Sequence, residues 1–398
     1  MSRSPDTKSS AGAPDSGSSS TQSGLMDLVR SHRILVFIGA GGVGKTTTSI
    51  GAAILGAMAG KRVALLSIDP AKRLAAALGM QLGNDLAPIN LKDLPGGGTI
   101  QGSVHAAMLD QKAVFDAMVR KHAPSKSVEA RILADPLYRA ASTNLAGPLE
   151  YMALARLHEL ADDPSWDLVV LDTPPDTHAL DFLARPNLLS GFMDNKVLSW
   201  LVKPFLMAGR FGFGKVLSLG EKLMGGMASI TGVDALRNFG EFLVLMQEVI
   251  EGFHKSGERV VEILRSAQTG FVMVTVPTRA AERSAIFLAG QLQTMGYGLD
   301  AVVLNRCLPA AVSSEIEAGR GTTSTPGTLD GILAARAHGE SKVIDGLAGK
   351  LEKSQTTAGS QTRRAVRLVR VDELTVDLHT RDSVLAFAES LRAAGRRR

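Results

Sequence analysis

Eight residues near the start of the chain have the spacing of a phosphate-binding loop. Glycines are needed where backbone N–H groups approach phosphate oxygens, and the loop must lead into the N-terminus of a helix. Lys45 can then reach the β- and γ-phosphates, and the hydroxyl of Thr46 can coordinate Mg²⁺. The pattern predicts an enzyme that hydrolyses ATP with Mg²⁺. The expected nucleotide-binding residues in this run are Gly39, Gly41, Gly42, Val43, Gly44, Lys45, Thr46 and Thr47, with Ala40 inside it.

The same glycines fit a second motif. Gly39, Gly41 and Gly44 have the G-x-G-x-x-G spacing of a dinucleotide-binding loop, and Asp69 stands where such a fold binds the ribose. Lys45 argues against a dehydrogenase, because a charged lysine at the start of the helix serves a triphosphate and has no part in the dinucleotide motif. We therefore interpret the run as a loop for ATP.

Two aspartates end apolar runs. Asp172 follows Leu168-Val169-Val170-Leu171, and Asp69 follows the apolar stretch 62–68. A carboxylate at the carboxyl end of a buried strand can hold Mg²⁺ or orient the attacking water. We predict Thr46 and Asp172 as metal-binding residues and Asp69 and Lys45 as catalytic residues. The alternative for each aspartate is a residue that only caps a turn.

Short β-branched segments alternate with helical patterns along the chain. Alternation of this kind predicts an α/β fold with a mainly parallel, doubly wound sheet of the P-loop NTPase type. We expect one domain over 25–398, preceded by a disordered tail over 1–24. A helical insertion subdomain is expected over 186–266, and a flexible loop region over 313–362 with a short helix at 329–338. The predicted strands are 33–38, 62–68, 167–171, 271–276, 301–304 and 366–371.

Composition restricts the class of protein. The chain has 398 residues, 45% of them hydrophobic and 21% charged, with a net charge of +5. Acidic residues are interspersed with the basic ones, so a nucleic-acid partner is not expected. One cysteine, Cys307, excludes an intramolecular disulfide framework and fits a reducing compartment. Without an apolar run of membrane-spanning length, we expect a cytoplasmic protein.

These motifs resemble the arsenite-pump and tail-anchored-protein-targeting ATPases, a family of dimeric P-loop ATPases with a deviant Walker A motif. The resemblance spans about 33 to 391. Its motifs are the phosphate loop 39–47, the first switch Ser67-Ile68-Asp69-Pro70-Ala71, the run Gly147-Pro148-Leu149-Glu150-Tyr151, the second switch Asp172-Thr173-Pro174-Pro175-Asp176-Thr177-His178, and Asn305.

The resemblance implies roles for three residues and a dimeric assembly. It implies that Asp69 activates water, that Asp172 holds Mg²⁺ through water, and that Asn305 reads adenine. The Asn305 amide can donate and accept hydrogen bonds at the edge of the base. The alternative for Asn305 is a turn residue at a strand end. The implied partner is a related ATPase, in a homodimer or a heterodimer.

The chain departs from the family pattern at two places. The signature lysine, which reaches the partner's phosphates across the dimer, falls on Ala40. We therefore expect hydrolysis that is slow or dependent on a partner. The metalloid and zinc sites of the family need several cysteines, and Cys307 cannot build either. Arsenite activation and a cysteine-built zinc site are not expected.

The helical insertion carries Met193, Met207, Met224, Met227 and Met246. Methionine suits a groove that accepts varied apolar helices, so a membrane-protein client is one hypothesis. The alternative is an ordinary helical core. Two other functions stay open: a positioning ATPase that cycles on a membrane surface, suggested by the basic end Arg396-Arg397-Arg398, and a catalytically weak nucleotide-binding subunit of a heterodimer.

Overall fold

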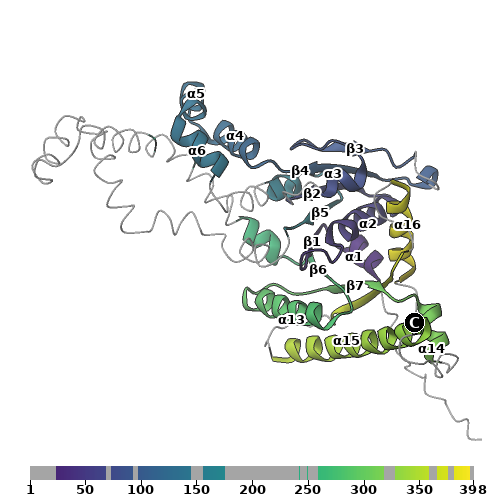
Figure 1. Cartoon of the computed structure of the whole chain (residues 1–398). Coiled ribbons are helices and arrows are strands. Elements are labelled where there is room, and N and C mark those ends of the chain that lie inside the picture. Colours follow the sequence, from purple (N-terminus) through teal and green to yellow (C-terminus); the bar gives the residue numbers. More distant parts are fainter. Residues whose placement is uncertain are drawn as a thin grey trace, which may run out of the picture.

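The structure, a computed structural model, contains a central β-sheet with helices on both faces (Figure 1). It describes residues 24–68, 73–92, 97–144, 156–174, 242, 249, 259–317, 328–357, 365–374 and 381–394. Within these ranges the sheet has eight strands in the order β3-β4-β2-β5-β1-β6-β7-β8. The strands are β1 (Ile34–Ile38), β2 (Arg62–Ser67), β3 (Ala87–Ile89), β4 (Ser103–Met108), β5 (Leu168–Asp172), β6 (Thr269–Thr275), β7 (Ala301–Cys307) and β8 (Arg367–Asp372).

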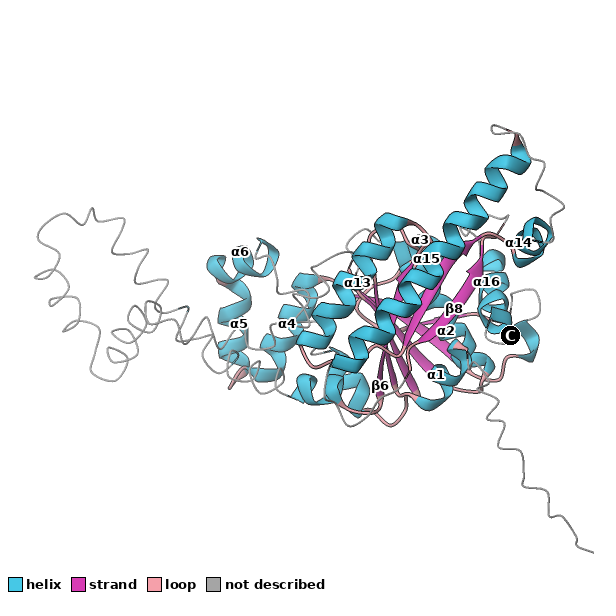
Figure 2. Ribbon diagram, turned by 90° about the horizontal axis from the view of Figure 1, so that it is seen from below, coloured by secondary structure: helices cyan, strands magenta, loops and turns pink. Residues whose placement is uncertain are grey.

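The sheet is parallel except for its edge strand β3, which pairs antiparallel with β4. One face is covered by α1 (Leu25–Ser31), α2 (Lys45–Met58), α3 (Arg73–Leu78) and α16 (Arg381–Ala394). The other face is covered by α4 (Gln111–His122), α5 (Lys126–Ala134), α6 (Pro136–Asn144), α13 (Arg279–Thr294) and α15 (Leu329–Thr357), as Figure 2 shows for α13 and α15. The described residues also form a 3-10 turn at Gly97–Thr99, α14 (Ala310–Glu317) and helical segments at 156–162 and 259–265. The α/β doubly wound prediction is confirmed.

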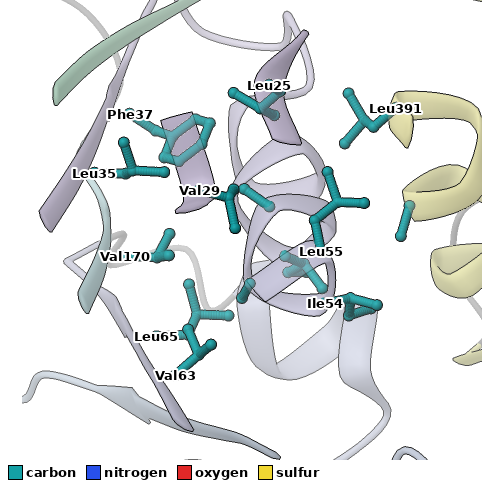
Figure 3. Packing of buried hydrophobic residues seen from close by; sticks show 14 of the residues in the cluster. Leu25, Val29, Leu35, Phe37, Ile54, Leu55, Val63, Leu65, Val170 and Leu391 are labelled. Atoms are coloured by element: carbon teal, nitrogen blue, oxygen red, sulfur yellow. The ribbon is translucent and has the colours of Figure 1, made fainter. Parts of the chain in front are cut away.

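The central strands consist mostly of apolar residues because both of their faces are covered. Every residue of β1, β5 and β6 is buried. On β1, Leu35 and Phe37 face α1 and α2, while the alternate residues face the opposite layer. Figure 3 shows Leu35 and Phe37 in one apolar layer with Val29 of α1 and Leu55 of α2. This burial fixes β1 beneath α2 and so determines where the loop between them lies.

All six predicted strands are present, with ends that differ by a few residues. Two strands were not predicted. The short edge strand β3 contains Pro88, and β4 carries the polar residues Ser103 and His105, so neither has the continuous apolar run of a buried strand. The strand β3 lies at the edge of the sheet, where proline is tolerated. The strand β4 lies between β3 and β2, and its polar residues Ser103 and His105 are only half-buried.

The prediction of a flexible loop over 313–362 is wrong for most of that range. The helix α15 contains 29 residues, not only the short predicted helix 329–338. Its glycines lower helix propensity by about 1 kcal/mol each and concealed the pattern. Val343, Leu347 and Leu351 are buried at helical spacing. A Cβ at Gly346 would lie 2.8 Å from Oε1 of Glu282, so this glycine permits the close approach of α13.

Several predicted features lie outside the described residues. These are the tail over 1–23, residues 69–71 of the first switch, including Asp69, the run 147–151, residues 175–178 of the second switch, nearly all of the insertion 186–266 with its methionines, and the basic end Arg396-Arg397-Arg398. In the described end of that insertion, Val260 and Leu264 are buried in the core. Among the described residues, no helix combines the length and apolar character needed to span a membrane.

Candidate functional site

The loop between β1 and α2 has a backbone that glycine adopts readily. Gly39, Gly42 and Gly44 have φ values of 153°, 79° and 93°, a region where a Cβ is strained. At Gly39 a Cβ would also overlap the carbonyl oxygen of Val274 on β6. Gly44 is the N-cap of α2, so the loop leads directly into the N-terminus of a 14-residue helix. Helix N-termini of this kind bind phosphate through backbone N–H groups.

Lys45 and Thr46 occupy the first turn of α2. Lys45 is buried, with 6% of its surface exposed. The Thr46 hydroxyl donates a hydrogen bond to Oδ2 of Asp172, at 2.8 Å. The structure therefore brings together two residues predicted for the metal site, although 126 positions separate them in the sequence.

Asp172 is the buried centre of this site. It ends β5, and its Oδ2 also accepts a hydrogen bond from the Ser67 hydroxyl, at 3.1 Å. Ser67 ends β2 and stands opposite Asp172 in the parallel register. Asp172 and Ser67 are both fully buried. These two hydroxyl donors orient Oδ2 of the carboxylate.

The oxygen donors of this site fit Mg²⁺. Magnesium prefers oxygen ligands, and proteins usually bind it through one or two side chains together with phosphate oxygens. Thr46 and Asp172 supply a hydroxyl and a carboxylate that already contact each other. Across the described ranges, no group of three or more His, Cys, Asp or Glu side chains could hold a metal ion. A protein-only metal cage is therefore not built by the described residues.

Ser67 was not predicted as a site residue. Its signal in the sequence is a hydroxyl at the end of the apolar run of β2, as the first residue of the first-switch motif 67–71. Thr173 was likewise not singled out. Its Oγ1 donates to the carbonyl oxygen of Phe37 on β1, at 2.7 Å, and so joins the carboxyl end of β5 to the start of the loop.

Asn305 lies against the phosphate loop. Its Nδ2 donates a hydrogen bond to the carbonyl oxygen of Val43, at 2.9 Å, and its side chain is buried. A Cβ on Gly44 would overlap this amide nitrogen. Asn305 therefore supports the loop at the point where α2 begins. Its predicted contact with adenine stays a prediction.

Ala40 and Cys307 lie near the site with side chains that carry no charge. Ala40 is half-buried and packs on the apolar cluster beneath α2. Cys307 is fully buried, and burial raises the pKa of its thiol to about 12. A buried thiol with a raised pKa is a poor nucleophile at neutral pH.

Comparison with known proteins gives a consistent set of matches. A sequence model described as "Anion-transporting ATPase" matches residues 32–323. An ATPase ASNA1 homolog of Entamoeba dispar is 25% identical over 279 residues, which cover 69% of this chain and 76% of the relative. An ATPase GET3 of Malassezia globosa is 26% identical over 279 residues, covering 70% and 74%. An arsenical pump-driving ATPase of Acidiphilium multivorum is 29% identical over 161 residues, covering 40% and 27%.

The Ser67 hydroxyl generates a test of the metal site. In Ser67→Ala, Asp172 loses one of its two hydroxyl donors, so the carboxylate is held less firmly. We expect the Mg²⁺ concentration for half-maximal ATP hydrolysis to rise by about fivefold to tenfold. A Mg²⁺ titration of turnover at saturating ATP measures this. Ser266→Ala is the control, because Ser266 donates only to Ile263 at the opposite end of the sheet. Equal Mg²⁺ dependence in both variants would contradict the assignment.

Proposed function

This chain belongs to the anion-transporting ATPase family, and on that premise we propose that it hydrolyses ATP with Mg²⁺ as a conformational switch. The observation that carries the proposal is the contact between Thr46 and Asp172 beside a glycine-built loop that opens α2. In enzymes that bind nucleoside triphosphates, the phosphates are bound by a helix N-terminus and a lysine. The metal is bound by a hydroxyl and a carboxylate.

Each part of the site has a distinct task in this proposal. Backbone N–H groups of the loop and the N-terminus of α2 bind the phosphates, and Lys45 neutralises charge that develops on them. Thr46 and Asp172 hold Mg²⁺, which offsets the charge of the transferred phosphoryl group. Ser67 keeps Asp172 oriented. Asp69 orients or deprotonates the attacking water, and Asn305 contacts adenine.

We propose further that the switch works as a cytoplasmic dimer, formed with a second copy or with a related ATPase. Nucleotide binding would move the two subunits against each other and change how the insertion 186–266 meets a partner or an apolar client helix. A positioning ATPase that docks its C-terminal helix on a membrane is less well supported. The apolar residues Val384, Phe387 and Leu391 of α16 are buried in the layer that contains α2.

Lys45 provides the direct test of the enzymatic proposal. Lys45→Ala removes the cation nearest to the phosphates, and we expect turnover to fall by about 100-fold or more. Phosphate release from purified protein with Mg-ATP measures this. Lys112→Ala is the control, because Lys112 makes only a surface ion pair with Asp116 on α4. Undiminished hydrolysis by Lys45→Ala would sink the proposal.

Ala40 gives a second test, which addresses the rate. If a missing cation limits hydrolysis, Ala40→Lys should raise turnover by about tenfold or more, because a lysine can extend from a half-buried position with its ammonium outside the core. Ala40→Met has a similar length and no charge, and it should leave turnover at the starting level. A faster Met variant, or no gain with Lys, would show that the charge at this position does not limit the rate.

The client hypothesis has its own measurement. We expect an apolar helical peptide with a photoreactive group to crosslink to the insertion 186–266 in one nucleotide state and much less in the other. Crosslinking with ADP is compared with crosslinking in a non-hydrolysable ATP analogue. A polar helical peptide of equal length is the control. Identical crosslinking in both states would reject a nucleotide-gated groove.

A further inference from the structure

A bulge interrupts the pairing of β7 with β8 immediately beside the site. Leu304 pairs with Arg370, and the next pair is Cys307 with Asp372, so β7 advances three residues while β8 advances two. Arg306 lies in this bulge with a φ of 58°, and it is the one non-glycine residue with positive φ in the described part of the chain. A bulge of this kind redirects a strand, and surrounding contacts must hold its strained residue in place.

Two side chains of α15 hold the bulge from the side. Glu340 accepts a hydrogen bond at Oε2 from the backbone N–H of Leu308, at 2.8 Å, and its Oε1 accepts one from Nε of Arg336, at 2.8 Å. Nη2 of Arg336 donates to the carbonyl oxygen of Arg306, at 3.1 Å. The residues on both sides of Cys307 are therefore fixed to the same helix.

The end of β8 contributes to the same contacts. The Arg336 guanidinium also donates to Oε2 of Glu373, at 2.7 Å, and the backbone N–H of Glu373 donates to the carbonyl oxygen of Cys307, at 2.7 Å. Arg370 donates to the carbonyl oxygen of Leu308, at 2.7 Å. The hydrogen bond to Glu373 raises the pKa of Arg336 most, and the hydrogen bond to Glu340 raises it further. Its positive charge is thereby secured.

Asn305 lies in the bulge immediately before Arg306, and it donates to Val43 of the phosphate loop. Any shift of the backbone at Arg306 moves Asn305, because the two residues share a peptide unit. α15 lies beyond the range 32–323 that the family model matches. Figure 2 shows it beside α13, running along one face of the sheet.

We propose that Glu340 and Arg336 of α15 are positioning residues for nucleotide binding, and that they set ATP affinity by fixing Asn305 against the phosphate loop. This inference rests on the proposed ATP site. Glu340 is 5% exposed, and removing its carboxylate leaves the Leu308 N–H and one side of Arg336 without their acceptors. The strained Arg306 then loses part of its support, and the loop contact made by Asn305 weakens.

The test compares two buried glutamates that both join α15 to a neighbouring element. Glu340→Ala disrupts the bulge, whereas Glu282→Ala removes a carboxylate that binds Lys350 and Arg279 between α13 and α15. We expect Glu340→Ala to weaken ATP binding by about tenfold, measured by calorimetry with Mg²⁺ and a non-hydrolysable analogue. Glu282→Ala should lower thermal stability and leave the affinity within about twofold. Equal affinities in the two variants would overturn the inference.

Coupling to Asn305 distinguishes a positioning role from a general structural one. In an Asn305→Ala background, adding Glu340→Ala should change the ATP affinity by less than about twofold. The contact of Asn305 with Val43, through which Glu340 is proposed to act, is already lost in that background. Additive effects would overturn the inference. If Glu340→Ala fails to fold, Arg336→Gln at the more exposed end of the pair takes its place in the same cycle. A wild-type protein that binds no ATP would instead refute the proposed function.

Discussion

Burial of α2 against the sheet is the constraint on which the site depends. The helix has a buried face against the strands and further buried residues beneath α1 and α16. A Cβ at Gly56 would lie 2.7 Å from Val63 and 3.0 Å from Leu168, so the helix contacts two strands as closely as glycine allows. Because α2 cannot tilt without breaking this packing, its N-terminus stays at the carboxyl ends of the strands, where phosphate is bound.

The electrostatics of the site follow from this placement. A fully buried carboxylate costs free energy unless polar groups surround it. Asp172 meets that need through Thr46 and Ser67, which come from α2 and β2. A divalent cation would gain more from this carboxylate than from an exposed one, since less water competes for it. The contacts that orient Oδ2 of Asp172 in the folded chain would therefore also position this carboxylate for Mg²⁺ in the proposed site.

Much of this arrangement could be predicted from the sequence, because local residue patterns indicate the buried strands and the phosphate loop. Apolar runs marked the buried strands, and glycines with Lys45 and Thr46 marked the loop. The pairing of Thr46 with Asp172 followed from the common edge on which parallel strands end. Most of helix α15 was not predicted beyond the short helix 329–338, because its four glycines, at 331, 339, 346 and 349, resemble those of a loop. The bond from Asn305 to Val43 joins residues 262 positions apart and depends on a bulge that no local pattern marks.

The two sides of the phosphate loop are braced by different parts of the chain. On the β2 and β5 side, Ser67 contacts Asp172 at the proposed metal position, and these two residues begin the segments 67–71 and 172–178 that resemble the family's switches. On the β6 and β7 side, Val274 crowds Gly39 and Asn305 binds Val43, so this side restrains the loop itself. In the proposed site, loss of the γ-phosphate would change the charge first at the position where Thr46 and Asp172 would hold Mg²⁺. In the proposed cycle, hydrolysis would therefore be sensed on the first side, while the second keeps the loop ready for the next nucleotide.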